Sequence, residues 1–137
     1  MSESSWKYIN GYYDDKPAVD AYELLARHHP NVVEGYADLR ESLFREPPAG
    51  AIPVMYKELM IVAMECMIRK TNPPPEFHAR KAIEEGATVA QVSEAVCLAI
   101  ILGGMISYHD SGKYALIAAE KAAAEKDAAE KRRWSVK

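Results

Sequence analysis

Two glutamates on one predicted helix face have the residue type and the spacing that proton transfer needs. Glu58 and Glu65 lie in the otherwise apolar stretch VMYKELMIVAMECMIRK, residues 54 to 70. At this separation on a helix they differ by about 20° around the axis and by about 10 Å along it, so both point the same way. A carboxylate buried there would hold its proton more readily and could act as an acid or a base. Two glutamates at a solvent-facing edge, each in a surface ion pair, fit the same spacing.

His78 lies in TNPPPEFHARKAIEEGAT, residues 71 to 88, where consecutive prolines lead into a helix-like segment. The segment from 71 to 75 is short and stiff, so we expect a helix over residues 75 to 85 to fold back against residues 54 to 70. His78 would then lie one turn into the later helix, within reach of a carboxylate on the earlier one. A histidine paired with a glutamate is the minimum equipment for proton transfer. A structural histidine held by one hydrogen bond fits the same pattern.

Four more residues are candidates for the wall of a pocket around Glu58 and His78: Glu65, Cys66, Tyr108 and His109. The last two follow the diglycine at residues 103 and 104, where the start of a helix could line a pocket. Cys66, like Cys97, is flanked by apolar residues and is first of all a predicted small core residue.

Other kinds of site find no support in the sequence. His28 and His29 precede Pro30 at a predicted helix end, where positive charge is favoured for local electrostatic reasons. The chain has no H-E-x-x-H, C-x-x-C or H-x-x-x-H spacing and no glycine loop of the kind that holds phosphates. We therefore expect neither a metal site nor a cofactor.

Composition narrows the class of protein. The chain has 137 residues and a formal charge of −3, which argues against nucleic acid or a polybasic membrane contact as its partner. Its most apolar stretches are shorter than the roughly 20 residues that a membrane span needs. The N-terminus does not resemble a signal peptide, and two isolated cysteines suggest reduced thiols. We expect a cytoplasmic protein.

Hydrophobic periodicity predicts a single all-α domain, an antiparallel helical bundle. Residues 1 to 17 lack clear periodicity and are expected to form an N-terminal arm, followed by two amphipathic helices within residues 18 to 53. A helix over residues 54 to 70 and one over residues 75 to 85 come next. Thr88 and Gln91 form a capping box that starts another helix, and the last runs from about 107 to 134. The Ala-rich tail, residues 118 to 137, is expected to be helical and largely solvated.

Two of these helices are apolar around most of their circumference. Either they lie deep in one core, or part of their surface is buried by another copy of the chain. Because large apolar patches seek partners, we favour self-association.

Several short motifs resemble the carboxymuconolactone decarboxylase family, which includes the alkylhydroperoxidase D-like proteins. They are YKELMIVAM, HARKAIEEGATVAQVSEAVCLAIILGG and YALIAAE, and they span about residues 54 to 117. The resemblance implies an all-α fold of antiparallel helices that assembles as homotrimers or homohexamers.

The resemblance also implies roles for particular residues. Glu58 matches the family's glutamate and His78 its histidine, while the C-x-x-C pair of the peroxidase branch falls near Thr71 and Pro74. Because neither residue carries a thiol, disulfide-relay peroxide reduction is not expected. The resemblance then implies a cofactor-free acid–base decarboxylase or lyase that acts on a small carboxylated or lactone compound. A non-catalytic oligomeric binding protein of the same fold, and a peroxidase that uses Cys66 alone, remain as alternatives.

Overall fold

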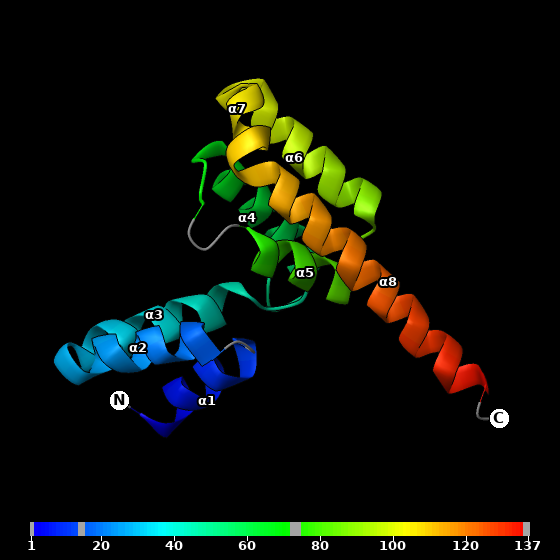
Figure 1. Cartoon of the computed structure of the whole chain (residues 1–137). Helices are drawn as coiled ribbons and strands as arrows, with labels where there is room; N and C mark the ends of the chain where they lie inside the picture. Colours follow the sequence, from blue (N-terminus) through cyan, green and yellow to red (C-terminus); the bar gives the residue numbers. More distant parts are fainter. Residues whose placement is uncertain (1, 14–15, 72–74, 136–137) are drawn as a thin grey trace. The chain divides into compact units, whose positions relative to one another are not determined.

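A computed structural model describes residues 2–13, 16–71 and 75–135 (Figure 1). The regular structure of these residues is entirely helical, which confirms the predicted all-α class. The elements in chain order are α1 Glu3–Tyr12, α2 Lys16–His28, α3 Pro30–Leu43, α4 Val54–Met67, α5 Glu76–Glu84, α6 Val89–Gly103, α7 Met105–Ser107, the π-helix η1 Tyr108–Gly112 and α8 Lys113–Ser135.

The chain divides into two compact units, Met1–Ala51 and Ile52–Lys137. The division falls inside the stretch EPPAGAIP, residues 46 to 53, whose prolines and glycine interrupt the helical pattern. The N-terminal unit contains α1, α2 and α3, with α3 packed against both other helices. The C-terminal unit contains the remaining elements and the candidate proton-transfer residues.

The N-terminal unit differs from the expected irregular arm, because residues 3 to 12 form α1. Ser2 caps this helix by accepting a hydrogen bond from the backbone N–H of Ser5. Its inward face is formed by Trp6 and the fully buried Ile9. Large aromatic side chains supply most of the apolar surface here, which is why the helical period is hard to recognise in the sequence.

The C-terminal unit is built around close helix packing. Helix α4 packs against α5 and α6, and α8 packs against the same two helices (Figure 1). Much of the shared core consists of alanines, whose small side chains let helices approach each other closely. The buried core residues are Val62, Cys66, Ala79, Ala82, Ile83, Ala87, Val92, Val96, Ala99, Ala115, Ala119 and Ala122.

The predicted C-terminal end of α5 and the predicted start of α6 are confirmed. Gly86, just beyond α5, has φ +105°, a left-handed conformation that glycine adopts without steric cost. Thr88 Oγ1 accepts a hydrogen bond from the backbone N–H of Gln91, and Gln91 Oε1 accepts one from the backbone N–H of Thr88. This reciprocal capping box starts α6 where the sequence predicts it.

Helix α4 ends earlier than predicted, at Met67 rather than near Lys70. Arg69 has φ +55°, so the chain reverses there. The backbone N–H of Lys70 donates to the carbonyl of Glu65, and that of Arg69 donates to the carbonyl of Cys66. These are the two hydrogen bonds of a Schellman ending, with arginine where glycine is usual.

None of the helices formed by the described residues is long and apolar enough to cross a membrane.

Gly112 is expected to be essential to the packing of η1 on α6. A Cβ added there would lie 2.6 Å from Val96 Cγ1, and Val96 is buried. Gly112→Ala should therefore destabilise the protein by about 1–3 kcal/mol through overpacking. Gly35→Ala in α3 is the matched control, because its Cβ meets no atom within 4 Å; it should stabilise by about 0.5–1 kcal/mol. Urea unfolding followed by circular dichroism measures both, and a Gly112→Ala protein as stable as wild type would contradict the packing argument.

Candidate active site

Glu58 on α4 and His78 on α5 form a buried hydrogen-bonded pair. His78 Nδ1 lies 2.6 Å from Glu58 Oε2, and the two residues are 8% and 1% exposed. With Glu58 ionised, Nδ1 must carry the proton of this contact, because an ionised carboxylate can only accept hydrogen bonds. The other ring nitrogen is Nε2, and an imidazole nitrogen can donate or take up a proton, depending on whether the ring is charged.

The local sequence accounts for the meeting of these two side chains. Glu58 lies on the second turn of α4, facing inward one turn before Val62. Pro75 occupies the N-cap of α5, so His78 falls in the first turn of that helix. Because α4 and α5 pack directly against each other, the turn that carries His78 is brought onto the carboxylate. The surface ion-pair alternative for Glu58 is thereby excluded.

A second carboxylate lies on the other side of the imidazole. Glu65 Oε1 is 3.9 Å from His78 Nε2, which is too long for a hydrogen bond, and it forms an ion pair with Lys70 Nζ. Glu65 Oε2 is buried and has no hydrogen-bond partner among the described residues. Side-chain exposure falls along this series from 33% at Lys70 to 11% at Glu65 and 10% at His78, and then to 1% at Glu58. The four residues form a polar path from the surface into the core.

The sequence did not predict Lys70 as a member of this path, nor Ser111 as the residue that anchors it. On a continuous helix, residues five positions apart lie about 140° apart around the axis, so Lys70 would point away from Glu65. The reversal at Arg69 brings the lysine back. Ser111 Oγ on η1 then donates to the Lys70 carbonyl at 2.7 Å and anchors the turn. Since nothing in the residue type of Arg69 signals a left-handed conformation, the sequence carries no cue for this contact.

Cys66 lies next to the cluster but is poorly suited to act as a nucleophile. It is fully buried, and burial raises the pKa of its thiol to about 11. A hydrogen bond with Ser111 lowers this pKa in part, and the nearby charge of Glu65 raises it further. The group is therefore a thiol, not a thiolate, near neutral pH. Thr71, at one of the two positions matched to the redox cysteines, is exposed, and Pro74 lies outside the described residues.

Tyr108 and His109 lie on η1 with different surroundings. Tyr108 packs against the hydrophobic core of the C-terminal unit, whereas His109 is exposed. Their rings contact each other with centroids 5.7 Å apart. His109 is therefore not part of the buried cluster around His78.

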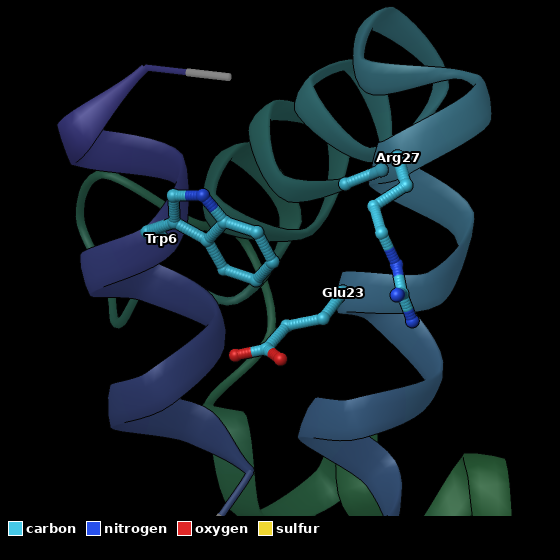
Figure 2. A pocket seen from close by; sticks show the side chains of 4 residues that line it. Trp6, Glu23 and Arg27 are labelled. Carbon is cyan, nitrogen blue, oxygen red and sulfur yellow. The ribbon is translucent and has the colours of Figure 1, made fainter.

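A pocket of about 530 Å³ lies in the N-terminal unit and is lined by Trp6, Glu23, Ala26 and Arg27. Figure 2 shows Trp6 on α1 and Glu23 on α2 extending toward the space between these helices. None of its lining residues is among the candidates that the sequence singled out. Within the described ranges, no three His, Cys, Asp or Glu side chains are grouped as the ligands of a metal ion would be.

The fold of this chain is similar to that of a solved structure. No protein-family model matches the chain, and no curated protein matches it. A solved structure does: a crystal structure from Burkholderia xenovorans LB400 described as a "putative carboxymuconolactone decarboxylase". It superposes with a TM-score of 0.76 at 26% sequence identity, and the match covers 96% of this chain and 98% of the other.

The match extends beyond residues 54 to 117, the part of the chain whose motifs carry the resemblance, and includes nearly all of the remainder. A match of this extent reflects the fold of the chain as a whole, because it does not depend on any single motif. It confirms the resemblance of this chain to the carboxymuconolactone decarboxylase family.

Proposed function

We propose that this protein is a cofactor-free acid–base enzyme of the decarboxylase or lyase type, acting on a small carboxylated or lactone compound. The observation that carries the proposal is the buried hydrogen bond between His78 Nδ1 and Glu58 Oε2. The description of the matched crystal structure as a decarboxylase agrees with this class of reaction.

In the proposed reaction His78 and Glu58 have different roles. In decarboxylation of a lactone acid, the bond to the leaving carboxylate breaks and CO2 departs, while the electron pair moves onto the lactone carbonyl as a dienolate. A new C–H bond then forms with a proton from His78 Nε2. Glu58 orients the ring and stabilises its charged form by accepting the hydrogen bond from Nδ1. Water resupplies one proton per turnover.

The thiol alternative has weaker support. A peroxidase that uses one thiol needs that thiol as an accessible thiolate, whereas Cys66 is buried and its pKa is raised to about 11.

Self-association is part of the proposal. Helix α6 buries Val92, Val96 and Ala99 on one face and exposes a second apolar stripe on another. Leu98, Ile101 and Leu102 in that stripe are 61%, 75% and 80% exposed. An exposed apolar stripe of this kind is covered most simply by another copy of the chain, so we propose a homotrimer or homohexamer.

His78→Asn and Glu58→Gln should each lower kcat/KM by about 10²–10⁴-fold, because both remove a part of the proton-transfer pair. His109→Asn, a histidine change at an exposed position, is the matched control and should leave activity unchanged. Release of CO2 and loss of substrate, measured on a panel of muconolactone-like and small carboxylated compounds, reports the effect. A His78→Asn protein that keeps full activity, or a wild-type protein that turns over none of these compounds, would favour the non-catalytic alternative.

Cys66 is expected to be unreactive in the folded protein. In a Cys97→Ser variant Cys66 is the remaining thiol of the chain, so a colorimetric thiol reagent reports on it alone. At pH 8, well below its pKa of about 11, the native variant should show no fast reaction, and unfolding in guanidinium should release one reactive group. Fast reaction of the native variant would instead support the alternative of a single-thiol peroxidase.

Leu102→Glu should disrupt the assembly, because it places a charge at an 80% exposed position of the apolar stripe. Light scattering coupled to size-exclusion chromatography should show a smaller particle than wild type. Lys121→Glu, a charge change at an exposed polar position of α8, should leave the mass unchanged. Equal masses for Leu102→Glu and wild type would show that the stripe is not the interface.

A further inference from the structure

The pocket of the N-terminal unit takes no part in the proposed acid–base reaction, and its walls combine an apolar surface with two opposite charges. Its volume of about 530 Å³ is typical of sites for small molecules. Trp6 comes from α1, whereas Glu23, Ala26 and Arg27 come from one face of α2 (Figure 2). The pocket is therefore formed between two helices.

The apolar wall of this pocket rests on the core of the N-terminal unit. Trp6 and Ala26 are both half-buried, and they pack against the buried cluster of Ile9, Val33 and Ala37. The small side chain of Ala26 leaves open the space that a larger residue would fill. The Trp6 indole is thus a packed apolar surface beside an open space, and a ligand can use it without rearrangement of the helices.

The two charged residues of the pocket do not pair with each other. Glu23 and Arg27 have the spacing at which a glutamate and an arginine commonly form an ion pair on a helix. At the same spacing on the same helix, Lys16 Nζ lies 2.7 Å from Asp20 Oδ1. Within the described residues no such ion pair joins Glu23 to Arg27. Figure 2 shows the Glu23 side chain extending toward α1 and the Arg27 side chain lying apart from it. Both residues are exposed, so each charge can meet a ligand.

We propose that this pocket binds a small zwitterion with an apolar body, of the kind represented by an aromatic α-amino acid. Glu23 accepts hydrogen bonds from the ammonium group of the ligand, and the Arg27 guanidinium donates hydrogen bonds to its carboxylate. The apolar body lies against the Trp6 indole.

The balance of charge in the pocket sets its selectivity. The lining carries one negative and one positive group, at Glu23 and Arg27. A ligand with only an ammonium group is repelled by Arg27, and a ligand with only a carboxylate is repelled by Glu23. A ligand that carries both groups meets an opposite charge at each end, so the pocket favours it over either singly charged analogue.

Three ligands with the same phenylethyl body test this charge requirement near neutral pH. L-Phenylalanine carries both charges, phenethylamine only the ammonium group, and 3-phenylpropanoate only the carboxylate. In a Trp134→Phe parent protein Trp6 is the remaining tryptophan of the chain, so its fluorescence reports binding at the pocket. Trp134 is 74% exposed on α8 and does not line the pocket. L-Phenylalanine should bind at least about 5-fold more tightly than either analogue, because each analogue lacks one charge-assisted hydrogen bond.

Removal of one wall charge at a time should change the ligand preference in opposite directions. Glu23→Gln should weaken L-phenylalanine binding by about 5-fold and strengthen binding of 3-phenylpropanoate, whose repulsion is lost. Arg27→Met should weaken L-phenylalanine binding similarly and strengthen binding of phenethylamine. Ala26→Leu, which fills the pocket without a change of charge, should weaken all three ligands. Glu41→Gln, at an exposed position of α3 outside the pocket, is the matched control and should keep the affinities of the parent.

The crossed preferences separate a ligand site from residues that only stabilise the fold. Equal affinities of the parent for the three ligands, or no binding of L-phenylalanine, would overturn the proposal. It would also be overturned if Glu23→Gln and Arg27→Met changed all three affinities in the same direction. An Ala26→Leu protein that is folded by circular dichroism and binds L-phenylalanine as tightly as the parent would contradict it as well. Because the pocket does not include His78, these outcomes leave the proposed acid–base reaction untouched.

Discussion

The burial of the Glu58 carboxylate is the constraint on which the arrangement of the C-terminal unit depends. A carboxyl group on a side chain that is 1% exposed needs a hydrogen-bond partner within the protein, and His78 Nδ1 lies 2.6 Å from Glu58 Oε2. Removing one member of a buried polar pair typically costs about 3–5 kcal/mol, because the other member is left without compensation. The contact thus holds α4 and α5 in one relative position.

Close packing supports that contact. Alanines fill much of the core between α4, α5, α6 and α8, so the helices lie near one another and small displacements are resisted. Gly112 on η1 allows an approach to Val96 that a side chain would block. The π-helical turn places Ser111 against the carbonyl of Lys70, which fixes the end of α4. π-helical turns occur frequently at functional sites, and here the turn connects the core packing to the polar cluster.

In the cluster around His78, side-chain exposure falls from Lys70 at the surface to Glu58 in the core. Its outermost member is a lysine, and its innermost is a carboxylate sealed in the core. Cys66 lies beside the same path, and its burial keeps it as a thiol near neutral pH.

The sequence by itself determined the helical class, the starts of α4 and α6, the end of α5 and the identity of the pair Glu58 and His78. These features follow from local rules: apolar periodicity, a capping box, a glycine at a helix end and a short proline-rich connection. The tertiary structure alone decided that Glu58 is buried, that Lys70 joins the cluster and that His109 is excluded from it. Each of these depends on contacts between residues far apart in the chain, or on a left-handed turn at an arginine, and neither leaves a local pattern. The same reason explains α1, whose aromatic residues are recognisable as a helix face only once α3 is packed against them.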